Sequence, residues 1–153
     1  MGHRLYVFLR SDLESMVPGK AAAQVSHAAT LCAGEALRLD KKHLISKAYR
    51  EWEKEGDGFG TTIVLDGGNL GNIESELGDF EDCLYGQVDD PTYPIVDGTF
   101  THLVPVTTCL WIFVDKEDQA SSYGNARYLY YAPLYQGNRT KKGELGYEIE
   151  QVK

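Results

Sequence analysis

The sequence has few cysteines and no recognisable metal-binding pattern. Its three cysteines, Cys32, Cys83 and Cys109, lie far apart, and neither a CxxC pair nor a Cys/His ligand spacing occurs. A disulfide framework is therefore not expected, and a reducing compartment, the cytoplasm, is the natural location. We also expect no metal ion and no bound cofactor, because ligating residues do not cluster along the chain.

Long hydrophobic runs are absent as well. No run approaches the roughly 18 apolar residues that a transmembrane helix needs, and residues 1–12 are too short and too charged for a signal peptide. We therefore expect no membrane partner. The chain has 153 residues, of which 42% are hydrophobic and 25% charged. This composition is typical of a globular protein with a single core.

Positive charge is scarce. Fifteen basic residues stand against 23 acidic ones, which gives a formal net charge of −8. Nucleic-acid binding depends on the neutralisation of phosphates by Lys and Arg, so this balance argues against an extended nucleic-acid surface. A small basic pocket on an acidic body remains compatible with it.

The hydrophobic pattern predicts a single α/β domain with a mixed sheet and helices on both faces. Residues 89–94 contain two prolines and are predicted to be a loop rather than a helix or a central strand. Strands are expected at residues 5–9, 61–65 and 83–88 and as one long strand from 102 to 114, and helices at 20–39, 41–54 and 69–81.

The end of the chain has a different composition. Six of the ten tyrosines lie in the last 31 residues, among glycine, asparagine and charged residues. We therefore divide the chain into a domain at residues 1–114 and a tyrosine-rich extension at 115–153, in which 128–131 could add an edge strand. The extension could also pack on a second copy of the chain, which leaves a homodimer open.

The start of the first long helix is the most informative stretch. Gly19 permits close backbone approach, and the free N–H groups of a helix start favour an anion. Lys20 adds a positive charge there, and Gln24 lies one turn further on the same face. The plainer interpretation is a solvated lysine that begins an alanine-rich helix, with His27 as a packed core residue.

These residues also carry a resemblance. The run RSDL at 10–13, followed by GKAAAQVSHAA at 19–29, resembles the opening of type 2 peptidyl-tRNA hydrolases, the archaeal and eukaryotic class. The similarity returns at Asp89 and in IVDGTFT at 95–101, and it covers about residues 4–114. It implies a four-stranded mixed sheet, an active site that includes Lys20, Gln24 and Asp89, and a structural role for His27.

Two positions depart from the family pattern. The family's lysine at the end of the second strand falls near Leu65 and Asp66, and its threonine after the aspartate falls on Tyr93. Ester hydrolysis needs an activated water and a group that stabilises the oxyanion. Asp89 could orient the water and Lys20 could stabilise the charge, but loss of the second lysine weakens the contacts to phosphate.

The segment around Asp89 has several interpretations. Adjacent acids before a proline commonly form turns, but these two could also receive a ribose hydroxyl, a cationic group or, less readily, a metal ion. Tyr93 is the best candidate for a stacking or hydroxyl contact to a ligand. Thr99 and Thr101 complete a predicted ligand-binding set with Gly19, Lys20, Gln24 and Asp89.

Three functions follow. The first is binding, without cleavage, of a phosphate-bearing, nucleotide-like small molecule, of the kind by which a phage protein could sequester a host's signalling nucleotide. We favour it narrowly, because the second lysine and a basic surface are both missing. The second is an active peptidyl-tRNA hydrolase, and the third is a protein-interaction module that uses the tyrosine-rich extension.

Overall fold

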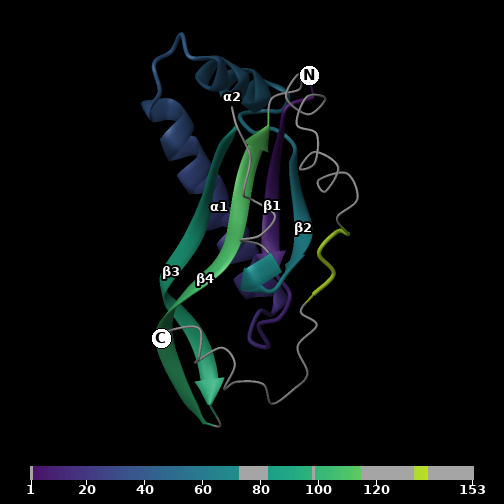
Figure 1. Ribbon diagram of the computed structural model, residues 1–153, viewed down its shortest axis with the longest axis vertical. Coiled ribbons are helices and arrows are strands. Elements are labelled where there is room, and N and C mark those ends of the chain that lie inside the picture. Colours follow the sequence, from purple (N-terminus) through teal and green to yellow (C-terminus); the bar gives the residue numbers. More distant parts are fainter. Residues whose placement is uncertain (1, 73–82, 98, 115–132, 138–153) are drawn as a thin grey trace.

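The computed structural model describes residues 2–72, 83–97, 99–114 and 133–137. Four strands form one sheet in the order β2-β1-β4-β3, in which β1 is parallel to β2 while β4 is antiparallel to both of its neighbours (Figure 1). This confirms the predicted α/β domain with a four-stranded mixed sheet. The elements are β1 (Arg4–Arg10), α1 (Pro18–Arg38), α2 (Leu44–Lys54), β2 (Thr62–Gly68), β3 (Leu84–Asp97) and β4 (Phe100–Val114).

The sheet separates two hydrophobic clusters. Alternate residues of β1 point to opposite faces: Leu5, Val7 and Leu9 join the cluster that contains α1 and α2, whereas Tyr6 and Phe8 join the other. Both described helices thus cover the same face, and they lie behind the sheet in Figure 1. The helix expected at 69–81 begins at residues 70–72, and the rest of it lies outside the described residues.

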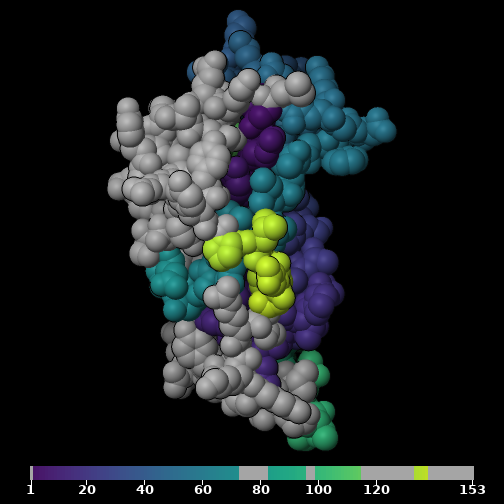
Figure 2. All heavy atoms as spheres, turned by 90° about the vertical axis from the view of Figure 1, so that its right-hand side faces the viewer, coloured from purple at the N-terminus to yellow at the C-terminus, as the bar shows by residue number. Residues whose placement is uncertain are grey.

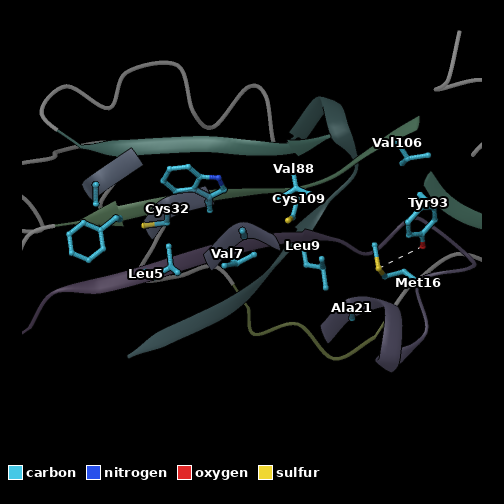
Figure 3. Packing of buried hydrophobic residues seen from close by; sticks show 14 of the residues in the cluster. Leu5, Val7, Leu9, Met16, Ala21, Cys32, Val88, Tyr93, Val106 and Cys109 are labelled. Carbon is cyan, nitrogen blue, oxygen red and sulfur yellow. Dashed lines mark hydrogen bonds between the residues drawn. The ribbon is translucent and has the colours of Figure 1, made fainter. Parts of the chain in front are cut away.

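Helix α1 lies close to the sheet because its inner side is made of small residues. Ala28, Cys32 and Ala36 recur every four residues and are fully buried. Figure 3 shows Cys32 of α1 in the same core as Leu5, Val7 and Leu9 of β1. Pro18 starts the helix in its first turn, where a missing N–H costs nothing. The alanine-rich sequence therefore places the polar residues of α1 within reach of β3 and β4.

The segment at 89–94 is not the loop that its prolines predicted. It belongs to β3, which forms a long antiparallel hairpin with β4. Because β3 is an edge strand, it accepts proline, and its register shifts at Val88/Asp89 and again between Asp90 and Tyr93. The long strand expected up to residue 114 is confirmed as β4, and the hairpin tip projects beyond the rest of the sheet (Figure 1).

Residues 133–137 return to the sheet from the C-terminal extension. The Asp66 N–H donates to Pro133 O at 2.8 Å, the Tyr135 N–H donates to Val64 O at 3.1 Å, and Leu134 forms an antiparallel bridge with Leu65. This short segment therefore covers the outer edge of β2, as Figure 2 shows in yellow. The edge strand expected at 128–131 lies outside the described residues.

All three cysteines are free thiols. Among the helices that the structure describes, none combines the length and the apolar character required to span a bilayer.

Candidate functional site

Two side chains of α1, one turn apart, bond to β3. Lys20 Nζ donates to Pro94 O at 2.5 Å, and Gln24 Nε2 donates to Asp90 Oδ2 at 2.7 Å. The contacts run in opposite directions along the two elements, so α1 and β3 are antiparallel here. The face of α1 that the sequence singled out therefore lies against the irregular part of β3.

Gln24 is the middle member of a buried hydrogen-bonded chain. Its side chain is almost entirely buried, and its Oε1 accepts a hydrogen bond of 2.7 Å from the Thr108 hydroxyl. Because the amide oxygen is occupied by this donor, the amide NH₂ is directed to Asp90. Thr108, Gln24 and Asp90 thus form an ordered relay from β4 through α1 to β3.

Asp90 is held in its ionised form. Burial by itself would raise the pKa of this carboxyl, but hydrogen bonds from Gln24 and from the backbone N–H and hydroxyl of Thr92, together with the charge of His27, lower the pKa below its ordinary value. Hydrogen bonds to a carboxylate favour the charged form. Asp90 is consequently a fixed carboxylate that stays negative at neutral pH.

Asp89, which the resemblance placed in the active site, has different partners. Its oxygens accept from Gln87 Nε2 at 3.0 and 2.9 Å and from the Thr107 hydroxyl at 2.5 Å, and its side chain is exposed. The register shift at Val88/Asp89 decides which of the two adjacent carboxylates faces α1. Sequence reasoning missed the Gln24 contact of Asp90, because no local signal separates two neighbouring aspartates.

A groove of about 350 Å³ opens beside these carboxylates. Its walls come from one face of α1 and from the bulged part of β3, and both Asp89 and Asp90 contribute to it. Lys20 and Gln24 are not among its lining residues, so Gln24 acts on the groove through Asp90. The lining residues are His27, Thr30, Leu31, Val88, Asp89, Asp90, Pro91 and Thr92.

Tyr93 lies in the core. It is fully buried, and its hydroxyl accepts a hydrogen bond from the Ser15 hydroxyl at 3.1 Å. The same hydroxyl donates to Met16 Sδ at 3.7 Å (Figure 3). Lys20 Nζ lies 5.2 Å from the centroid of its ring, within the range of a cation–π contact. The ring therefore has no open face on which a base could stack.

The other predicted ligand-binding residues are spread out. Gly19 is exposed at the start of α1, and a methyl group there would meet none of the described residues beyond its chain neighbours within 4 Å. Thr99 and Thr101 are exposed near the hairpin tip. Thr101 lies six residues from Thr107 along β4, which is about 20 Å of strand. The structure thus brings Gln24 to Asp90, and Lys20 to Pro94 four residues further along β3. Asp89 bonds to Gln87 and Thr107 instead, and the two threonines of the tip lie apart from these contacts.

The place where the family would have its second lysine holds a buried acid. Asp66 Oδ1 accepts from the Ser11 hydroxyl at 2.6 Å and from the Gly68 N–H at 2.9 Å. Leu65 beside it is also buried. Residues 61–68, which include all of β2, contain no lysine or arginine.

Arg10 is a further residue that the sequence did not reveal. Its guanidinium is completely buried and forms two parallel hydrogen bonds with the Asp12 carboxylate, of 2.8 and 2.7 Å. Its Nη1 also donates to Thr107 O at 3.1 Å. The Thr107 hydroxyl in turn donates to Asp89. Arg10 therefore fixes the position of the residue that holds the Asp89 carboxylate at the groove.

The part of the chain that the structure describes contains no group of three or more His, Cys, Asp or Glu side chains that could hold a metal ion. A search of curated proteins found no match to this chain. A family model described as "Peptidyl-tRNA hydrolase PTH2" matches residues 3–119, about three quarters of the sequence and the whole of the sheet with α1 and α2. The resemblance in the opening motif is thereby confirmed, and the chain belongs to the peptidyl-tRNA hydrolase PTH2 family.

Proposed function

We propose that this protein hydrolyses the ester bond between a peptide and the 3′ end of tRNA. One observation carries the proposal: in a chain of this family, a buried relay from Thr108 through Gln24 holds an ionised Asp90 at the wall of an open groove. A carboxylate fixed in this way can accept a proton from a water molecule in the groove.

The reaction follows from that geometry. Asp90 takes a proton from water as the water oxygen attacks the ester carbonyl carbon. The bond between that carbon and the 3′ oxygen of the terminal ribose then breaks, and the proton passes to the leaving oxygen. The products are a peptide with a free carboxylate and a tRNA with a free 3′ hydroxyl.

Lys20 does not line the groove, so in this proposal it stabilises the developing oxyanion through its charge and not by direct contact. Its ammonium group donates to Pro94 O, four residues beyond Asp90 along β3. Its place over the Tyr93 ring limits the movement of the side chain. A positioned cation near the developing negative charge lowers the activation free energy of ester hydrolysis substantially.

A matched pair of substitutions tests this assignment. Asp90→Asn and Asp89→Asn remove the same charge from adjacent residues of one groove. With purified protein and peptidyl-tRNA, we expect Asp90→Asn to lower kcat by about 10²- to 10⁴-fold, as loss of a general base does, and Asp89→Asn by less than about tenfold. The reverse order would assign the base to Asp89 instead, as the resemblance implies. Equal and full activity of both variants would contradict carboxylate catalysis in this groove.

A second function has its own support. The net charge of −8 and the buried Asp66 in place of a lysine weaken the hold on a large polyanion. These features favour a protein that binds a small phosphate-bearing, nucleotide-like molecule near Lys20 without cleaving it, including a signalling nucleotide sequestered by a phage protein. The buried Tyr93 ring and the acidic groove argue for the hydrolase as the first choice.

A thermal-shift panel of mono- and cyclic nucleotides separates the two functions. A ligand raises stability by RT ln(1 + [L]/Kd), so a tight nucleotide gives a clear rise in Tm that Lys20→Ala diminishes. Such a rise in a protein that leaves peptidyl-tRNA intact would replace the hydrolase with the binding function. No shift across the panel removes the binding function.

A further inference from the structure

Positive charge is concentrated in one stretch of this acidic domain. Residues 38–50 contain five basic residues and one acidic residue, whereas the rest of residues 1–114 contains four basic and 16 acidic residues. Arg38, Lys41 and Lys42 are all exposed where α1 ends and the chain turns toward α2. We call these three residues the basic ridge. Figure 1 shows the α1–α2 connection at the opposite end of the molecule from the hairpin tip.

A single face of α1 connects the groove to the basic ridge. His27, Leu31, Gly34 and Arg38 occupy positions i, i+4, i+7 and i+11, which share one side of a helix. His27 and Leu31 line the groove, and the side chain of Arg38 is 74% exposed. Arg38 follows Leu31 by seven residues and His27 by eleven, which corresponds to about 10 Å and about 16 Å of helix.

Gly34 has no side chain, so nothing projects from its own position on this face of α1, between Leu31 and Arg38. Among the described residues, and apart from the adjacent backbone of the helix, a methyl group at Gly34 would meet the Nη2 atom of Arg38 at 3.9 Å. The guanidinium therefore extends back over Gly34 toward the groove. Arg38 also pairs with Glu35 at 2.6 Å, but this pair is largely exposed, and exposed ion pairs are weak enough to exchange for a phosphate.

The two ends of this face have opposite charge. Asp89 and Asp90 make the groove unfavourable for phosphate, while the basic ridge attracts it. A substrate that fits has its scissile bond at one end and its phosphates some distance away. From this, and resting on the proposed function, we infer that the outer face of α1 carries the single-stranded 3′ end of tRNA, with the ester in the groove and the phosphates on the basic ridge. Leu31, a lining residue of the groove that is 43% exposed, offers an apolar contact for a base next to the ester.

Two double variants of equal charge test this path. Arg38→Gln/Lys41→Gln removes two positive charges from the basic ridge, and Lys47→Gln/Lys54→Gln removes two from exposed positions on α2. We expect the ridge variant to raise KM for peptidyl-tRNA about three- to tenfold with kcat within about twofold. Loss of two phosphate contacts to a single strand also makes the slope of log Kd against log salt shallower by about 1.4. The α2 variant should change both quantities by less than half as much.

The readouts separate this inference from the proposed function. If the wild type cleaves peptidyl-tRNA and the two variants raise KM equally, the path along α1 is wrong while the hydrolase stands. If the wild type does not cleave peptidyl-tRNA, the proposed hydrolase function is wrong. Binding of an acceptor-stem RNA that has its 3′ overhang but carries no peptide then tests the basic ridge directly. A selective loss of that binding in the ridge variant supports the path. An equal loss for an RNA without the overhang overturns it.

Discussion

The Tyr93 hydroxyl joins the β3 edge strand to the loop between β1 and α1, through Ser15 and Met16. Tyr93→Phe removes this contact and keeps the ring, so we expect the free energy of unfolding to fall by about 1 kcal/mol. Tyr93→Ala should cost about 3–5 kcal/mol, because it leaves a cavity in the core. Urea unfolding followed by tryptophan fluorescence measures both. A Tyr93→Phe protein of unchanged stability but altered KM would instead place the hydroxyl against a ligand.

Asp90 makes stability depend on pH in a defined direction. The lowered pKa of its carboxyl in the folded state means that the stabilisation is fully present above the ordinary carboxyl pKa of 3.8 and is lost as the pH falls through the folded-state value. The Tm of the wild type should therefore exceed that of Asp90→Asn at pH 7, and the difference should shrink below about pH 4. Thermal unfolding of both proteins between pH 7 and pH 2.5 checks this. A difference that is constant over the whole range would contradict it.

At the scale of elements, β3 determines the shape of the site. The two prolines at 91 and 94 are incompatible with a regular central strand. The structure accommodates them because β3 is an edge strand and its pairing with β4 has two register shifts. The shifts let the adjacent Asp89 and Asp90 reach different partners, Thr107 and Gln24. Sequence alone could not give this result, since a bulge depends on how β3 pairs with β4 and on what α1 presents to it.

The docked segment at 133–137 is the second element with a measurable role. Tyr135 packs against the main core and donates its hydroxyl to Met16 O at 3.3 Å, whereas the neighbouring Leu134 is 60% exposed. We expect Tyr135→Ala to lower the free energy of unfolding by about 1–3 kcal/mol and Leu134→Ala by less than about 0.5 kcal/mol. Urea unfolding of the two variants provides the comparison. Equal effects would mean that the segment does not hold the sheet edge in solution.

For the molecule as a whole, the reactivity of the three thiols measures how well the folded core excludes solvent and reagents. Burial raises the pKa of Cys32 and of Cys109 to about 12, while Cys83 is partly exposed. Because the thiolate is the reactive form, iodoacetamide at pH 8 should modify Cys83 first. The other two cysteines should react only as the domain unfolds. Mass spectrometry of the labelled peptides over time checks the order, and labelling of Cys32 as fast as Cys83 would show that α1 separates from the sheet.

Charge is also organised at the scale of the whole molecule. The sequence total of −8 argued against nucleic acid, but the total hides the concentration of basic residues at 38–50. The fold places that stretch at the end of the helix whose opposite end contacts Asp90 and Pro94. Net charge therefore excluded a broad basic surface without excluding a narrow one.

The sequence by itself determined strands β1, β2 and β4, helices α1 and α2, the alanine face of α1 and the family, because each depends on residues close together along the chain. Only the tertiary structure decided that Asp90 meets Gln24, that Tyr93 is enclosed and that residues 133–137 cover the edge of β2. These contacts join residues more than 60 positions apart. Register shifts and long-range packing set them, and neither leaves a local pattern from which they could be predicted.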